Sequence, residues 1–191
     1  MTMQNVEYRL AQDRDFTAIV RLNEANFVKN LNESEREDGF LSAIFSLEQI
    51  VAMASDLGIT IANVDGVLAG FLCAFRNDFD HGSPVVAKMI EAYPHMLFES
   101  RPLSEWRTYV YGPVCIDRRF RRSGLLRGLY TSQLRSLAGQ FEVGVALISR
   151  NNPHSMAAHL AGLGMIETGD FAISGNVFAT VAFRVPKSPT K

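Results

Sequence analysis

The stretch from Tyr109 to Tyr130, YVYGPVCIDRRFRRSGLLRGLY, limits the folds open to this chain more than any other. It begins with an apolar run rich in β-branched and aromatic residues, continues with an arginine-rich segment, and ends in an apolar-periodic helix that opens near Ser123 and Gly124. The first N–H groups of a helix lack backbone partners and lie at the positive end of its dipole, so they can bind phosphate oxygens. The stretch therefore predicts a strand, an anion-binding loop and a helix.

Five arginines lie at this junction between strand and helix: Arg118, Arg119, Arg121, Arg122 and Arg127. Arginine suits phosphate because its planar guanidinium presents a fixed fork of donors. The alternative is a basic face that is simply solvated. The position of the cluster beside Gly124 favours phosphate binding, with Arg121 and Arg122 as first candidates and Arg127 as the second. Arg118 and Arg119 are expected to face water.

Residues 121–126, Arg-Arg-Ser-Gly-Leu-Leu, resemble the phosphate-binding signature of the GNAT family of acetyl-CoA-dependent N-acyltransferases. That signature is Gln or Arg, two residues, Gly, one residue, then Gly or Ala, and Leu126 stands here at the small position. A second segment, which runs from Asn152 through Ser155 to His159 and ends in Leu-Gly-Met at 163–165, resembles the family segment that ends in Leu-Gly-Phe. It has one residue more than usual between the histidine and the glycine.

The alternation of strands and helices indicates an α/β fold with a mixed sheet covered by helices. The resemblance implies the GNAT-like form of it, with a mainly antiparallel central sheet of about seven strands. At 191 residues and 47% hydrophobic content, the chain is expected to form one domain over residues 1–186, followed by a tail at 187–191. Residues 78–105 are an insertion between two paired strands, of the kind that often forms a substrate lid.

The resemblance also implies a cofactor, acetyl-CoA, that leaves as CoA after direct transfer of the acetyl group to a primary amine, without a covalent enzyme intermediate. The acceptor would be a small molecule or an amino terminus. The pantetheine arm would lie along the strand as an added strand does. The implied cofactor-binding residues are Val114, Cys115, Ile116, Arg121, Arg122, Ser123, Gly124, Leu125, Leu126, Asn152, Ser155 and His159. The alternative function is a CoA or acyl-CoA sensor that has lost catalysis.

Two residues are the catalytic candidates. His159 stands where relatives often carry a tyrosine that protonates the departing thiolate, and an imidazole with a pKa near ~6.5 could donate that proton. Alternatively, and with equal weight, His159 packs against the cofactor and transfers no proton. Tyr111, like Tyr109 and Glu105, lies on or beside the strand that would face the acceptor. Glu24 of the first expected helix or a bound water could serve as the general base instead. Cys115 is expected to be a packed thiol, because nothing in the sequence pairs it with a base.

Hydrophobic periodicity and capping signals predict the remaining elements. A capping box of Ser46 and Gln49 opens a helix that extends to about Ser55, and Asp65-Gly66 is a strong hairpin signal. The expected strands are 6–10, 57–64, 67–76, 106–116, 140–149, 165–173 and 176–185. The expected helices are 15–31, 46–55, 84–98, 123–139 and 153–163, and the polar run 32–38 is expected to end the first of them.

Inside the insertion, Asp78, Asp80 and His81 could line a site for a cationic amine, or they could form a solvated turn. They are not expected to bind a metal, because no second ligand cluster accompanies them.

Charge, cysteine content and hydrophobicity limit the partners and the cellular compartment that we expect for this protein. The net charge of −1 and the pI of about 6.4 give no global attraction to nucleic acid or an anionic membrane. Cys73 and Cys115 lie in apolar runs and are expected to be buried free thiols of a reducing compartment. No apolar run approaches the roughly 20 residues that a membrane helix needs, and the first 15 residues have no apolar signal core. We expect a cytoplasmic protein, and the sequence is compatible with a homodimer.

Overall fold

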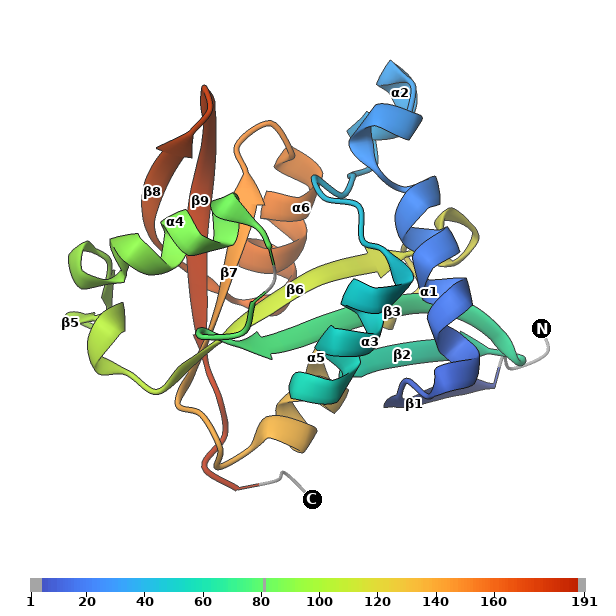
Figure 1. The fold of residues 1–191 in the computed structure, drawn as a ribbon, viewed down its shortest axis with the longest axis horizontal. Helices are drawn as coiled ribbons and strands as arrows, with labels where there is room; N and C mark the ends of the chain where they lie inside the picture. Colours follow the sequence, from blue (N-terminus) through green and yellow to red (C-terminus); the bar gives the residue numbers. More distant parts are fainter. Residues whose placement is uncertain (1–4, 81, 189–191) are drawn as a thin grey trace.

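The computed structural model describes residues 5–80 and 82–188, and within them the chain forms a seven-stranded sheet in the order β1-β2-β3-β6-β7-β9-β8 (Figure 1). The strands are β1 (Val6–Leu10), β2 (Ile59–Val64), β3 (Val67–Arg76), β6 (Thr108–Ile116), β7 (Val143–Ser149), β8 (Ile166–Ile173) and β9 (Asn176–Arg184). Neighbouring strands are antiparallel except β6 and β7, which are parallel. The predicted mixed, mainly antiparallel sheet is therefore confirmed.

Helices cover both faces of this sheet (Figure 1). On one face lie α1 (Asp13–Ala25), α3 (Leu47–Asp56) and α4 (Pro84–Ala92), and on the other lie α5 (Leu125–Leu137) and α6 (Pro153–Ala157). The short elements are α2 (Glu33–Glu37), the 3-10 turns η1 (Val28–Asn30), η2 (Tyr93–His95), η3 (Leu103–Glu105) and η4 (Arg118–Phe120), the π-helical turn η5 (Ala158–Gly162), and the small hairpin of β4 (Leu97–Phe98) and β5 (Arg101–Pro102).

The sheet separates two hydrophobic cores. Ile19 of α1 and Phe71 of β3 belong to the core on the α1 side, whereas Leu129 of α5 and Leu72 of β3 belong to the core on the α5 side. All four side chains are fully buried, and burial of such a side chain contributes about 1.5–3 kcal/mol. Strand β3 is thus apolar on both faces, as its sequence predicts for a central strand.

The local signals near α3 and the first hairpin are confirmed. The Ser46 Oγ atom accepts from Gln49 N at 3.3 Å, and Gln49 Oε1 accepts from Ser46 N at 2.9 Å, which is the predicted capping box. Asp65 and Gly66 both have positive φ, as the tight turn between β2 and β3 requires.

The first helical region differs from the prediction. Helix α1 ends at Ala25 rather than near Leu31, because the Asn26 side chain donates to Leu22 O and Phe27 forms a bridge with Leu41. The polar run 32–38 was expected to be a break, but it contains the short helix α2. A capping box between Asn32 and Glu35 explains that helix.

The insertion between β3 and β6 is only partly helical. Helix α4 ends at Ala92, earlier than the predicted Phe98, and η2, the β4–β5 hairpin and η3 follow it. Pro94, within η2, lacks the N–H that a continued helix would use. Across the described ranges, none of the helices combines the length and the apolar character that a membrane span requires.

Candidate functional site

A gap opens between the two central strands. Strands β6 and β7 pair only where residues 108–110 face residues 143–145, and beyond Val110 they diverge (Figure 1). A bulge in β6 accompanies the divergence, because Gly112 and Pro113 together stand opposite the single residue Cys73. Gly112 has φ +105°, a conformation that side chains other than glycine's rarely allow. The far half of β6 is therefore a free strand edge inside the molecule.

The ladder with β3 decides which main-chain groups face this free edge. Asp117 N donates to Ala69 O. Hydrogen-bonded pairs alternate with non-hydrogen-bonded pairs in an antiparallel ladder, so Cys115 and Phe71 also exchange main-chain hydrogen bonds. Val114 and Ile116 alternate with Cys115, and their main-chain groups point toward the gap, where the Ile116 C=O group already accepts from Arg121 Nε. An extended ligand could pair with them as an additional strand would.

The free edge leads to the start of α5. Gly124 is the N-cap with φ +86°, and a Cβ built there meets no atom within 4 Å. Among the described residues, none of the main-chain N–H groups from Arg122 to Arg127 donates a hydrogen bond to the protein. These donors at the positive end of a 13-residue helix form an anion-binding surface.

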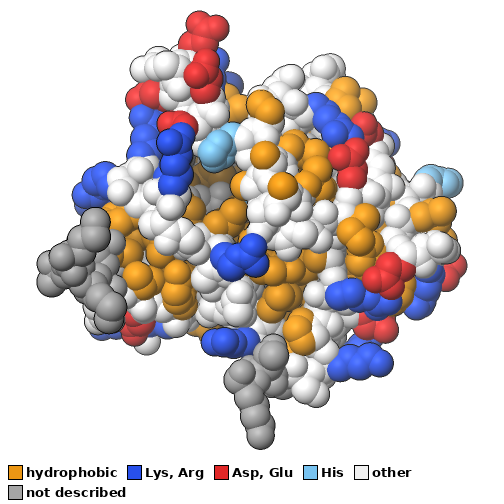
Figure 2. All heavy atoms as spheres, turned by 180° about the vertical axis from the view of Figure 1, so that it is seen from behind, with side chains coloured by type: hydrophobic (Ala, Val, Ile, Leu, Met, Phe, Trp, Pro, Cys, Tyr) orange, Lys and Arg blue, Asp and Glu red, His pale blue; other side chains and the backbone are white. Residues whose placement is uncertain are grey.

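A groove of about 280 Å³ joins the free edge of β6, the start of α5 and the residues of α6. Figure 2 shows a hollow on the face turned away from Figure 1, with a histidine beside it and Lys or Arg side chains along one edge. The lining of the groove contains every one of the predicted cofactor-binding residues except Ser123. The structure thus brings together two sequence segments that are about 30 residues apart.

Arg121 has protein partners at each guanidinium nitrogen. Nε donates to Ile116 O at 3.2 Å, Nη1 to Asp38 O at 2.9 Å and Nη2 to Asn26 Oδ1 at 2.9 Å. Arg121 therefore positions the segments around it, and each Nη nitrogen keeps one further N–H that a ligand in the groove could use. Arg122 is 83% exposed, with Asp38 Oδ1 at 3.5 Å, and is the freer cation at the groove.

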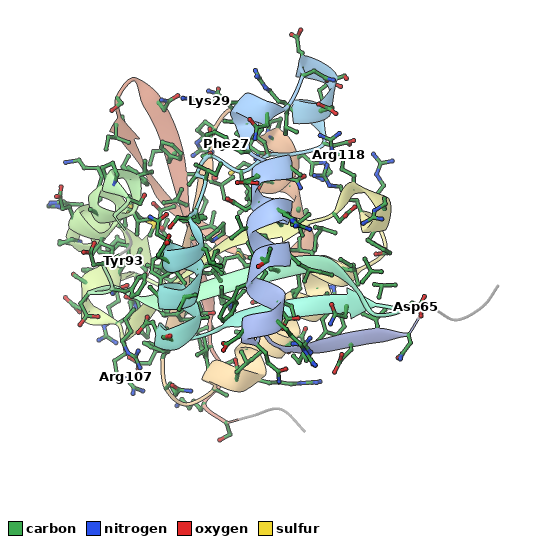
Figure 3. All side chains as sticks on the ribbon, turned by 45° about the vertical axis from the view of Figure 1, so that its right-hand side comes forward. Phe27, Lys29, Asp65, Tyr93, Arg107 and Arg118 are labelled. Carbon is green, nitrogen blue, oxygen red and sulfur yellow. The ribbon has the colours of Figure 1, made fainter. Side chains whose placement is uncertain are left out.

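The other three arginines also have partners. Figure 3 shows Arg118 near α2, where it forms an ion pair with Glu35, and it shows Arg107 at the opposite end of β6. Arg119 pairs with Asp117 at 2.8 Å, and this guanidinium holds the pKa of that carboxyl below its usual range. Arg127 donates to Gly162 O. The predicted water-facing pair therefore also makes ion pairs: Arg118 with α2, and Arg119 within its own loop.

Residues 38–41, here called the crossing segment, pass over the groove and are held on both sides. Arg121 binds Asp38 O on the α5 side, and Asn152 Nδ2 donates to Phe40 O at 3.1 Å on the α6 side. Asn152 Oδ1 also accepts from Ser155 N at 3.1 Å, so Asn152 is the predicted cap of α6 as well. The capping role follows from the sequence, whereas the contact with the crossing segment spans 112 residues and has no sequence signal.

His159 lies at the junction of the groove with a second cavity and is only 4% exposed. Its Nδ1 atom is 2.7 Å from Ser155 O. A carbonyl oxygen only accepts hydrogen bonds, so Nδ1 carries the proton and Nε2 has the lone pair. Burial lowers the pKa of His159, and the bond to Ser155 opposes that shift only in part. The ring is therefore neutral near pH 7.

Tyr111 packs against the His159 ring, with 5.7 Å between the ring centroids, and it lines the second cavity. Its hydroxyl is buried and has no hydrogen-bond partner within the described part of the chain. Burial raises the pKa of Tyr111, so the phenol stays protonated. The second cavity, of about 170 Å³, lies across the gap between β6 and β7.

Comparison with known proteins rests on structure. No model of a protein family matches the chain, and no curated protein matches its sequence. An N-acetyltransferase from Staphylococcus aureus Mu50 superposes with a TM-score of 0.62 at 16% identity, covering 95% of this chain and 99% of that one. The yncA protein from Salmonella typhimurium, solved with acetyl-CoA, gives 0.60 at 15% identity over 98% of both chains. The ribosomal-protein-S18-alanine N-acetyltransferase from Escherichia coli gives 0.62 at 10% identity over 95% of both.

This chain has the GNAT fold. The resemblance drawn from residues 121–126 and 152–165 is confirmed at that level. Cys73 and Cys115 are free and buried, and burial raises the pKa of the Cys115 thiol to about 12. Because the thiolate is the nucleophilic form, Cys115 is a packing residue of this GNAT fold, as expected.

The two described acidic residues of the insertion turn lie outside the groove and the second cavity. Neither Asp78 nor Asp80 lines the groove or the second cavity, and Asp80 borders a separate pocket beside Phe45. The positions of Asp78 and Asp80 favour the alternative of a solvated turn, and His81 lies outside the described residues. Ser83, Val85 and Val86 of the same insertion do line the second cavity. Among the described residues, no group of three or more metal-ligating side chains gathers.

Proposed function

We propose that the chain is an N-acetyltransferase that moves the acetyl group of acetyl-CoA directly to a primary amine of a small molecule or a peptide amino terminus. One observation carries this proposal: the free edge of β6 leads without interruption to the unpartnered N–H groups at the start of α5. The catalytic domain would be residues 1–186, with the insertion 78–105 as one wall of the acceptor site.

The residues present fit CoA. The main-chain groups of Val114 and Ile116 match an extended chain of amides, and the donors from Arg122 to Arg127 match a pyrophosphate. Leu126 lines the groove beside these donors. When bound, acetyl-CoA supplies an acyl group that is already activated as a thioester. The protein then has to position an amine, remove its proton and stabilise the oxygen that becomes negative.

His159 is suited to move that proton. Its neutral ring accepts a proton at Nε2 while Nδ1 stays bonded to Ser155 O. The protonated ring can then donate from Nε2 on the thiol side, because His159 lines both the groove and the second cavity. The sequence suggests only that His159 donates a proton to the departing thiolate. A neutral ring must first take up a proton before it can do so. The Tyr111 hydroxyl, buried and without a partner, would donate a hydrogen bond at the same junction.

Two measurements test the proposal. Isothermal titration calorimetry with acetyl-CoA should give a dissociation constant in the micromolar range, and no binding near millimolar ligand would refute the proposal. Release of free CoA thiol should then depend on an added amine. Tight binding without thiol release across a broad amine panel would instead support the sensor function.

A further inference from the structure

The second cavity has walls from seven parts of the chain. It shares Val114, Ser155 and His159 with the groove. Its remaining walls come mostly from elements on the α3 and α4 side of the sheet: Phe45, Phe75, Val85, Val86, Val110 and Phe178. Direct acetyl transfer requires both reactants to meet at the shared wall. If CoA occupies the groove, this cavity is the space that remains for the acceptor.

The walls of the cavity are apolar. Among the described residues that line it, none is Asp, Glu, Lys or Arg, and the polar members are serines, Asn152, Tyr111 and His159. An ammonium or carboxylate group held in such surroundings without a partner of opposite charge is strongly disfavoured. A second charge on the acceptor would therefore oppose binding.

The same walls favour the reactive form of one amine. Removal from water disfavours the charged form of a group, so an apolar cavity lowers the pKa of a bound alkylammonium. The amine then loses its proton more easily to His159 Nε2. No carboxylate base is needed for this step, which agrees with the absence of acidic side chains from the described lining.

The cavity volume limits the apolar group. Its size, about 170 Å³, compares with the ~150 Å³ of an engineered apolar cavity that binds benzene. One aromatic ring or one branched aliphatic side chain fits that space.

We infer that the acceptor is a primary amine that carries a single uncharged apolar group of about one ring, and no second charge. This inference rests on the proposed function and narrows its substrate class. It also assigns Phe45, Val86 and Phe178 as specificity-determining residues.

The inference is tested by calorimetry on the whole protein saturated with CoA. 2-Phenylethylamine should bind about tenfold or more tightly than 1,5-diaminopentane, because the second ammonium of the diamine has no partner in the cavity. Comparable or reversed affinities would overturn the inference, as would no binding of the ring amine at millimolar concentration. Failure of acetyl-CoA itself to bind would instead refute the proposed function.

A charge-introducing variant sharpens this test. Val86→Asp places a carboxylate in the first turn of α4, where the helix dipole tolerates it, and it should raise the affinity for 1,5-diaminopentane about tenfold while lowering that for 2-phenylethylamine. Val51→Asp is the matched control, because Val51 is exposed on α3 and should change neither affinity. Equal effects of both variants would count against the inference.

The competing occupant is a longer acyl chain. If the cavity held an acyl group, hexanoyl-CoA would bind more tightly than acetyl-CoA and would exclude 2-phenylethylamine. That result would overturn the inference. We expect the ring amine to bind beside CoA, and beside acetyl-CoA to be acetylated with release of CoA thiol.

Discussion

The groove and the second cavity meet at Val114 and His159, yet they are built from different chemistry. The groove offers main-chain donors at the start of α5 and the exposed cation of Arg122, whereas the cavity offers apolar side chains from both sides of the β6–β7 gap. The groove suits a charged ligand that needs few specific side chains. The cavity suits a ligand that is selected by shape and by lack of charge.

This difference teaches why one site has a sequence signature and the other does not. The groove depends on backbone conformation, which a short segment around Gly124 determines locally. The cavity depends on side chains that come from positions as distant as Phe40 and Phe178. Only the finished fold brings those positions together.

The largest effect is expected at Gly124. Gly124→Val puts a side chain into the open space beside the free N–H groups, and loss of even one bond to a charged group, about 1.5–3 kcal/mol, weakens acetyl-CoA binding by about tenfold to a hundredfold. Gly175→Val is the matched control, because Gly175 also has positive φ and open space but lies in the β8–β9 turn. Calorimetry should show unchanged affinity for the control. Equal losses of affinity in both variants would refute the binding of acetyl-CoA by the main-chain N–H groups at the start of α5.

Arg121→Ala should act on stability. It removes three donors that hold Ile116, Asp38 and Asn26, and we expect the free energy of unfolding to fall by about 2–3 kcal/mol in urea denaturation. Acetyl-CoA affinity should fall as well, because the crossing segment loses its hydrogen bond from Arg121 to Asp38 O. A fully stable variant with weak binding would show that Arg121 contacts phosphate directly.

A smaller effect is expected from His159→Gln, and it depends on pH. Burial holds the pKa of His159 below its value in the unfolded chain, near ~6.5, so the unfolded state takes up the proton first as pH falls. The neutral ring therefore contributes stability above about pH 6.5 that is lost as pH decreases toward the folded pKa. Denaturation curves between pH 5 and 8 should show a flatter pH dependence in His159→Gln. His154→Gln, at an exposed position of α6, should keep the wild-type slope.

The smallest effect is expected from Arg122→Ala. Its side chain is exposed, so the stability should change by less than about 0.5 kcal/mol. Acetyl-CoA affinity should fall a few-fold at low salt and converge with wild type as salt rises, because an exposed charge is screened. A loss that persists at high salt would indicate a buried, direct contact.

Much of the fold follows from the sequence because its signals are local. Ser46 with Gln49, Asp65 with Gly66 and Asn152 with Ser155 each form the cap or turn that their identities predict. The end of α1 does not follow from the sequence, because Phe27 forms a bridge with Leu41 and no local pattern marks Leu41 as its partner. The hydrogen bond of Arg121 to Asn26 likewise has no sequence signal, because the two residues are 95 positions apart.

The π-helical turn η5 explains how the chain holds its additional residue between His159 and Gly164. Such a turn stores one residue more than the α-helical winding it replaces. A change of chain length at this point can therefore be absorbed by rewinding η5, while Asn152 and α6 keep their places before it and β8 keeps its register after it.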